Sequence, residues 1–304
     1  MNKFSLAIVG SSKIALIHYK FLKEYNFSKV FFIGRSKKKI LSFLKVNKII
    51  KANILQKRKI TKKNFDVMAI CNNTNYHQDY LNLIANSPKL LIIEKPIISI
   101  KIFKKDYKIY LQKIYKKFKN LIVAYPMVYL ARSISDFIRI KSKIKQIEVN
   151  YSTSGKQRGD EIFIDLSPHA LTFFHEICKI NKVKIDEIVK IKKTIKPKIW
   201  VATIIFKNIR LLINFKKIPK KEKSKFSVKI NNLSIKRITK EKNKIFINYL
   251  EFNKKITQIQ NPMKNVFEDA INSIVKKKIY KKNKDLTMWL MKMTEKIYFN
   301  KITK

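Results

Sequence analysis

The sequence has few glycines, cysteines and acidic residues, and these shortages narrow the kinds of site and the classes of protein that fit it. Only 4 Gly and 2 Cys occur among 304 residues. Cys71 and Cys178 lie far apart and outside any Cys-x-x-Cys pair, which argues against a disulfide framework and a structural zinc site and favours a reducing compartment. Hydrophobic residues make up 46 % and aromatics 12 % of the chain, which excludes a disordered basic tail. The length suits about two domains.

Acidic residues number 20 against 69 Lys and Arg, for a net charge of +49. Such a charge first suggests binding to nucleic acid or an anionic membrane. However, 62 of the basic residues are Lys and they run along the whole chain, whereas proteins that grip phosphate usually also use Arg. We therefore interpret the charge as a Lys-rich background and predict no specific nucleic-acid partner; a charge-driven nucleic-acid binder is the alternative.

Long apolar runs are also lacking. No stretch reaches the ~20 apolar residues that span a bilayer. The start, MNKFSLAIVG, has a short apolar run that leads directly into Ser11-Ser12-Lys13, which does not fit a signal peptide. The sequence thus predicts a cytoplasmic protein without a membrane partner.

In the first 120 residues, short apolar runs alternate with amphipathic stretches, which is typical of βαβ units and a parallel sheet. Such a sheet binds ligands at the carboxyl ends of its strands. The predicted strands are Phe4–Val9, Lys29–Ile33, Asp66–Cys71 and Leu90–Ile93, and the predicted helices are Lys13–Tyr25, Ser36–Val46 and Tyr76–Asn86.

From Ile188 onward, strand-like runs follow one another without helices, which predicts an antiparallel sheet. Asn265–Lys277 and Leu286–Tyr298 read as two closing helices. The predicted fold is α/β: an N-terminal Rossmann domain with a doubly wound parallel sheet (1–122), and a C-terminal α+β domain with a large, mostly antiparallel open sheet (123–304). The last helices could pack back on the first domain. Because an open sheet with an uncovered face usually needs a partner, we expect a homodimer or homotetramer.

The first functional motif is Gly10-Ser11-Ser12-Lys13-Ile14-Ala15, between the first strand and the first helix. It matches the dinucleotide fingerprint G-x-G-x-x-G/A, with Gly10 for the tight turn and Ala15 for close packing. Ser12 replaces the second glycine. The helix N-terminus offers N–H groups to an anion, so Gly10, Ser12, Lys13 and Ile14 are predicted to bind the cofactor. An ordinary strand-to-helix turn is the alternative.

Two further segments are predicted to contact the cofactor. The second strand ends in Gly34-Arg35-Ser36-Lys37, where NAD enzymes carry an acidic residue; Arg35 and Ser36 suit a 2′-phosphate and favour NADP over NAD. A plain basic turn is the alternative. The strand Asp66–Cys71 is followed by a polar loop, from which Asn73, Thr74 and His77 could touch the cofactor or simply cap a helix.

The catalytic candidates fall into two groups: one follows the strand Leu90–Ile93, and the other lies in a later segment. Glu94 and Lys95 precede Pro96 at a strand's carboxyl end, where an ammonium could stabilise an alkoxide. Asp165 and His169 lie one turn apart if their segment is helical, although Ser167-Pro168 could instead begin a helix. A His with a pKa near 6.5 can accept an alcohol proton while Asp orients it. The alternatives are a solvated lysine and a core histidine.

Taken together, these motifs resemble the glucose–fructose oxidoreductase / inositol dehydrogenase (Gfo/Idh/MocA) superfamily. The resemblance implies hydride transfer between NAD(P) and a hydroxyl-bearing carbon of a sugar, inositol or sugar-nucleotide. It implies that Lys95 lies near the reacting oxygen, that His169 is the acid/base, and that Asp165 is its partner or a substrate ligand. Glu94 and Lys95 would also contact the cofactor. Ser12 departs from the family pattern, and a catalytically silent Rossmann-type binding protein is the alternative. His18 and His175 are interpreted as helix-face residues without a role.

Overall fold

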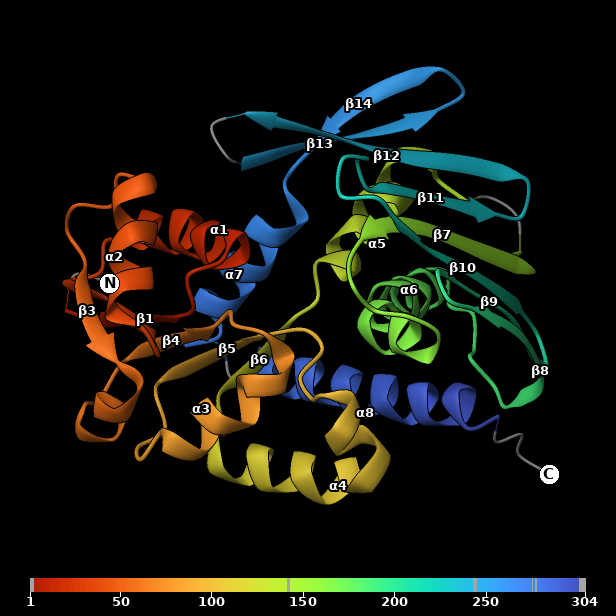
Figure 1. Cartoon of the computed structure of the whole chain (residues 1–304). Coiled ribbons are helices and arrows are strands. Elements are labelled where there is room, and N and C mark those ends of the chain that lie inside the picture. Colours follow the sequence, from red (N-terminus) through yellow and green to blue (C-terminus); the bar gives the residue numbers. More distant parts are fainter. Residues whose placement is uncertain (1–2, 141–142, 243–244, 275, 277, 301–304) are drawn as a thin grey trace. The chain divides into compact units, whose positions relative to one another are not determined.

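The computed structural model describes residues 3–140, 143–242, 245–274, 276 and 278–300. It comprises two compact units (Figure 1). Unit 1 is Met1–Ala124 with Val266–Asp285, and unit 2 is Tyr125–Asn265 with Leu286–Lys304. The chain therefore leaves unit 1 after Ala124 and contributes to it again near its end.

Unit 1 contains a six-stranded sheet in the order β3-β2-β1-β4-β5-β6, and every neighbouring pair is parallel. The order reverses between β1 and β4, which is the switch point where such sheets bind ligands. The predicted Rossmann sheet is thereby confirmed. Its strands are β1 (Ser5–Val9), β2 (Lys29–Gly34), β3 (Asn53–Gln56), β4 (Val67–Ile70), β5 (Leu90–Glu94) and β6 (Leu121–Ala124).

Helices cover both faces of this sheet, with α1 and α2 on one side and α3 and α4 on the other (Figure 1). The sequence did not predict α4, which is broken at Asp106 by non-helical backbone angles; the Asp106 carboxylate accepts a hydrogen bond from Ile109 N at 3.1 Å. The helices are α1 (Lys13–Leu22), α2 (Lys37–Val46), α3 (His77–Leu83) and α4 (Ile100–Lys117), with short 3-10 helices η1 (Lys23–Tyr25), η2 (Lys57–Lys62) and η3 (Thr74–Tyr76).

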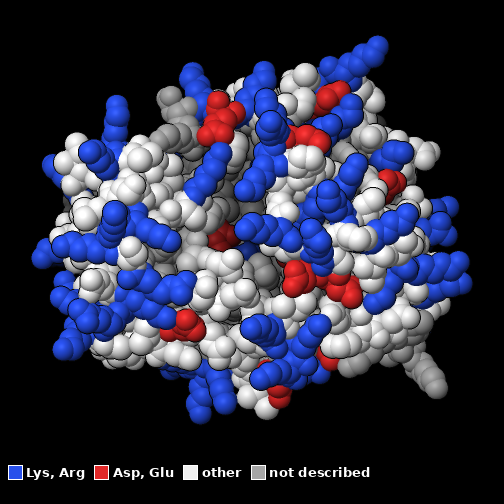
Figure 2. All heavy atoms as spheres, in the orientation of Figure 1, with Lys and Arg blue, Asp and Glu red and all other residues white. Residues whose placement is uncertain are grey.

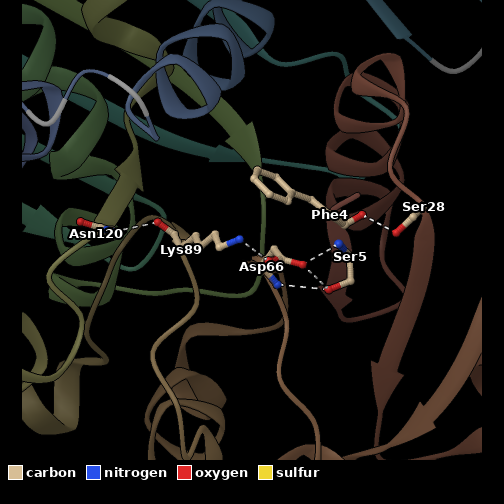
Figure 3. Close-up of polar contacts among 6 residues, drawn as sticks. All are labelled: Phe4, Ser5, Ser28, Asp66, Lys89 and Asn120. Carbon is tan, nitrogen blue, oxygen red and sulfur yellow. Dashed lines mark hydrogen bonds and ion pairs between the residues drawn. The ribbon is translucent and has the colours of Figure 1, made fainter. Parts of the chain in front are cut away.

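At the amino edge of the sheet, Asp66 ties together the starts of three strands (Figure 3). Its carboxylate accepts hydrogen bonds from Ser5 N at 2.9 Å and Ser5 Oγ at 3.0 Å, and lies 3.0 Å from Lys89 Nζ. Beside it, Ser28 Oγ donates to Phe4 O at 2.9 Å and Asn120 Nδ2 donates to Lys89 O at 3.0 Å. The polar side chains of this edge are thus engaged with one another.

Unit 2 contains an eight-stranded sheet in the order β14-β13-β12-β11-β7-β10-β9-β8. Its neighbours are antiparallel except for β7 and β10, which confirms the predicted mostly antiparallel sheet. The strands are β7 (Gln146–Ser154), β8 (Ile188–Lys196), β9 (Ile199–Phe206), β10 (Arg210–Ile218), β11 (Lys225–Ile230), β12 (Leu233–Lys242), β13 (Ile245–Phe252) and β14 (Lys255–Ile259).

Helix α6 (Asp160–Ile180) packs against β9 and β10, and α5 (Pro126–Ile138) packs against α6. Pro168 lies inside α6, so the alternative in which Ser167-Pro168 begins a helix is wrong. From Ile162 to Phe174, every α6 residue is buried except Asp165 and His169. The chain closes with α7 (Pro262–Asn272) and α8 (Lys278–Tyr298), both shared between the units.

Basic side chains spread over the visible face of both units rather than gathering in one patch (Figure 2). On this face, the basic side chains are as widely distributed as the lysines are along the sequence. No helix in the described part of the chain is long and apolar enough to cross a membrane.

Candidate functional site

The Gly10 turn lies at the switch point of the parallel sheet, directly after β1. Its φ is +122°, and a Cβ on Gly10 would lie 3.3 Å from the backbone nitrogen of Asn72. A side chain here would therefore be strained by conformation and crowded by the loop after β4. Glycine lets the two loops approach, so the predicted role of Gly10 as a tight turn has a physical basis.

Ser12 is the N-cap of α1. Its Oγ accepts a hydrogen bond from Ala15 N at 3.4 Å and donates one to Cys71 O at 3.4 Å. The start of α1 thus points to the carboxyl edge of the sheet, with Lys13 exposed and Ile14 half-buried. First-turn N–H groups and the helix dipole suit a phosphate. This geometry fits a dinucleotide pyrophosphate.

The loop after β4 lies beside this turn. Neither polar atom of the half-buried Asn72 side chain has a hydrogen-bond partner among the described residues. Asn73 is exposed and accepts a hydrogen bond from Asn75 N at 3.0 Å, while Thr74 is half-buried. The buried His77 has its Nε2 3.0 Å from Asn72 O. The loop therefore offers buried polar groups whose hydrogen-bonding capacity is unused.

Burial lowers the pKa of His77, although the hydrogen bond with Asn72 O partly opposes the change. His77 holds the loop through that hydrogen bond.

Arg35 follows β2 and extends to the loop after β4. Its guanidinium lies over the ring of Tyr76, 3.8 Å from the ring centroid, and its hydrogen bond with Tyr76 lowers the pKa of that phenol. Ser36 is the N-cap of α2 and accepts a hydrogen bond from Lys39 N at 3.3 Å. Arg35 also borders a cleft of about 810 Å³. The cleft is lined by Arg35, Gln56, Lys57, Arg58, Asp79, Asn82 and Leu83.

Glu94 ends β5, and its buried carboxylate Oε1 lies 2.6 Å from His18 Nε2 of α1. The sequence interpretation missed this pair and gave His18 no role. The spacing Ala15, His18, Leu22 was the available signal, because it places His18 on the buried face of α1. The pair joins the helix of the Gly10 turn to the strand that ends in Glu94.

Cys71 lies close to the Glu94 carboxylate, and Phe267 contacts its partner His18. Burial and the charge of Glu94 together raise the pKa of the Cys71 thiol, so Cys71 is an inert thiol at neutral pH. The ring of Phe267 from α7 packs edge-on against the His18 ring, 4.6 Å between centroids. Lys95 follows Glu94 at the same edge of the sheet and is half-buried.

In unit 2, Asp165 and His169 lie one turn apart on α6, as the helical alternative of the prediction required. Asp165 Oδ2 lies 2.9 Å from Nζ of Lys217, which belongs to β10. The His169 ring meets the Tyr151 ring of β7 at 81°, 5.0 Å between centroids. The structure therefore brings Asp165 and His169 into one cluster, to which it adds Lys217 and Tyr151.

The sequence interpretation also missed Lys217 and Tyr151. Residues of β10 alternate between faces, and Leu211, Ile213 and Phe215 are buried, so Lys217 falls in the inward register. Tyr151 pairs in register with Phe215 across β7 and β10. The alternation could have identified both positions, but not the ion pair that makes a lysine tolerable there.

No family model matches the sequence, and no curated protein matches it. Solved structures resemble it over nearly their whole length. A Gfo/Idh/MocA family oxidoreductase from Vibrio cholerae is 10 % identical, with a TM-score of 0.61, over 98 % of this chain and 99 % of the other.

Two more of the similar structures contain ligands. A mutant of the 3-ketoreductase KijD10 from Actinomadura kijaniata, in complex with TDP-benzene and NADP, is 8 % identical with a TM-score of 0.68, over 98 % of both chains. The WlbA dehydrogenase from Thermus thermophilus, in complex with NAD and UDP-GlcNAcA, is 10 % identical with a TM-score of 0.62, over 99 % of this chain and 97 % of the other. The chain therefore has the two-sheet fold of Gfo/Idh/MocA oxidoreductases, which confirms the predicted resemblance at the level of the fold.

Proposed function

We propose that this protein is an NAD(P)-dependent oxidoreductase that transfers hydride between nicotinamide and a hydroxyl-bearing carbon of a sugar, inositol or sugar-nucleotide. The observation that carries the proposal is the Gly10 turn. It combines a positive φ, a tight fit for any Cβ and the start of α1 at the switch point of a parallel sheet. Glu94 ends a strand at that same edge, and Lys95 follows it directly.

We propose NADP as the preferred cofactor. Arg35 and Arg58, two of only seven arginines in the chain, line one cleft beside the end of β2. Lys57, which lines the same cleft, is already paired with Asp79 at 3.0 Å. The two guanidinium groups therefore supply the positive charge that suits a 2′-phosphate. Ser36, Asn73, Thr74 and His77 would complete the contacts that the sequence predicts.

In the proposed reaction, the nicotinamide supplies the hydride acceptor or donor. His169 takes the substrate hydroxyl proton on its imidazole during oxidation and returns it during reduction. The Asp165 carboxylate orients that imidazole. Lys95 donates a hydrogen bond to the substrate oxygen and stabilises its alkoxide character.

The remaining proposals concern assembly and location. We propose a homodimer or homotetramer that pairs through the outer face of the unit 2 sheet. On β9, Trp200, Ala202 and Ile204 are buried, whereas Val201 and Ile205 on the other face stay partly exposed, as an interface face requires. We propose a cytoplasmic location, in line with the two free cysteines.

The test begins with titration of the purified protein with NADPH and NADH, followed by turnover assays with sugars, inositols and sugar-nucleotides. We expect saturable binding, tighter for NADPH, and turnover that His169→Ala lowers by orders of magnitude without unfolding the chain. Binding without turnover on any substrate would favour the catalytically silent alternative. Absence of saturable binding would contradict the proposal.

A further inference from the structure

Lys217 is the one buried lysine among the residues that the structure describes, with 4 % of its surface exposed. The other described lysines lie partly or fully in solvent, which is the usual place for this residue. Lys217 instead occupies the inward register of β10, in line with Leu211, Ile213 and Phe215. A buried ammonium is costly unless a charge or a hydrogen bond compensates it, so its position needs a specific reason.

The compensation comes from Asp165, whose Oδ2 lies 2.9 Å from Lys217 Nζ. The chain also leaves room for this ammonium, because a Cβ on Gly155 would lie 2.8 Å from Nζ and 2.5 Å from Gln157 Oε1. The φ of Gly155 is ordinary, so the requirement at this position is space rather than conformation. A methyl group at Gly155 would therefore require the flexible ends of Lys217 and Gln157 to shift.

The ion pair adjoins the proposed acid/base residue. His169 lies one turn from Asp165 on α6, and these two are the part-exposed residues of an otherwise buried stretch of the helix. A carboxylate at this spacing favours the protonated imidazole, and a lysine bound to that carboxylate weakens the effect. We propose that Lys217 is a positioning residue that fixes the Asp165 carboxylate and thereby sets the proton affinity of His169. The inference builds on the proposed function of that histidine.

Around this cluster, Gln157 Oε1 has no hydrogen-bond partner among the described residues, whereas other side chains are engaged. Tyr151 of β7 contacts the His169 ring edge-on, and Phe226 of β11 contacts Tyr151. Arg237 of β12 donates from Nε and a terminal nitrogen to Asn248 Oδ1, at 2.9 and 2.6 Å.

Two turns further along α6, Glu176 is paired with Arg132 of α5 at 2.7 Å. Lys217 and Asp165 form the ion pair of this cluster, so we expect their separation to change His169.

The test is an NMR titration of the His169 ring in the full chain, without substrate or cofactor. The chain has 4 His, so the His169 signal is assigned by its loss in His169→Gln. Lys217→Met should raise the pKa of His169 by about one pH unit, because it removes a positive charge and leaves the Asp165 carboxylate without the Lys217 ammonium. Lys216→Met is the matched control: it removes the neighbouring exposed lysine of the same strand and should change that pKa far less.

Two further variants keep the test decisive if Lys217→Met fails to fold. Gly155→Ala retains both charges and displaces only the flexible ends of Lys217 and Gln157, so it should raise the pKa of His169 by part of that amount. Asp165→Asn should lower the pKa of His169, and the double variant Asp165→Asn/Lys217→Met should return it near the Asp165→Asn value. An unchanged His169 pKa in a folded Lys217→Met or Gly155→Ala protein would overturn the inference, as would an equal shift in Lys216→Met.

The same variants separate this inference from the proposed function. If the pKa of His169 moves as expected but no sugar substrate turns over, the coupling holds and the proposed activity fails. If turnover is found and depends on His169, while Lys217→Met leaves both the pKa of His169 and the pH profile of kcat unchanged, only the positioning role fails.

Discussion

The two edges of the parallel sheet in unit 1 use their polar residues in opposite ways. At the amino edge, Asp66 engages Ser5 and Lys89, and little hydrogen-bonding capacity is left over (Figure 3). At the carboxyl edge, neither polar side-chain atom of Asn72 has a hydrogen-bond partner among the described residues. His18 Nδ1 also has none. Buried polar groups are normally satisfied, so unsatisfied ones are costly unless they serve a ligand.

The difference favours a stabilising role for the amino edge and supports the proposed binding role of the carboxyl edge. The two edges differ in backbone as well as in side chains, because the N-terminus of α1 lies at the carboxyl edge. Variants at opposite ends of one strand should therefore separate effects on stability from effects on activity.

The largest effect should come from the two lysines that flank β5. Lys95→Ala at the carboxyl end should lower kcat by about 10²- to 10⁴-fold, because the substrate oxygen loses its charged donor. Lys89→Ala at the amino end should leave kcat unchanged and lower the free energy of unfolding by about 1 kcal/mol, because Asp66 loses an ion-pair partner. Steady-state assays and denaturant unfolding measure both, and equal losses of activity in the two variants would contradict the assignment of roles.

The sequence predicted much of the carboxyl edge because local patterns specify it. Apolar runs marked the strands, and the spacing of Gly10, Ser12 and Ala15 marked the turn. The His18–Glu94 pair joins residues 76 positions apart, so a local pattern could place His18 on a buried face but could not name its partner.

Two features of the structure run against local preference. Lys217 occupies a core register that usually takes an apolar residue, and its ion pair with Asp165, 52 positions away, makes it tolerable. Pro168 lies inside α6 although proline lacks the N–H that a helix interior uses, so Ser167-Pro168 resembled a helix start. Helix α4 went unpredicted, and the break at Asp106 interrupts it.

A second pair of variants, at Gly10 and Asp66, should differ in its effect on NADPH binding. Gly10→Ala should weaken NADPH binding by about 100-fold, because the added Cβ crowds Asn72 N at 3.3 Å in a backbone conformation that side chains rarely adopt. Asp66→Asn should destabilise the fold and leave the dissociation constant for NADPH unchanged. Calorimetric titration of both variants measures the constants, and wild-type affinity in Gly10→Ala would exclude this turn as the pyrophosphate site.

A smaller effect should separate the two ends of β2. Arg35→Asp should lower the preference for NADPH over NADH by about 10- to 100-fold, because a charge-assisted contact to the 2′-phosphate is replaced by repulsion. Lys29→Asp makes the same charge change on an exposed residue at the strand's amino end and should leave the preference intact. The measurement is the ratio of the dissociation constants for NADPH and NADH. An equal loss of affinity for both cofactors would show that Arg35 does not recognise the 2′-phosphate.

The smallest effect should be the pH dependence that Asp66 gives to stability. Partial burial raises the pKa of this carboxyl, but hydrogen bonds from Ser5 and Lys89 outweigh burial and hold the pKa below its ordinary value. A depressed folded-state pKa contributes stability above the unfolded pKa of about 3.9, and that contribution is lost as the pH falls through the folded value. Wild-type stability should therefore fall more steeply below about pH 4 than that of Asp66→Asn, by about 1 kcal/mol. Urea unfolding at pH 3 and pH 6 measures the difference, and equal slopes for the two proteins would show that Asp66 gains nothing from its partners at the amino edge.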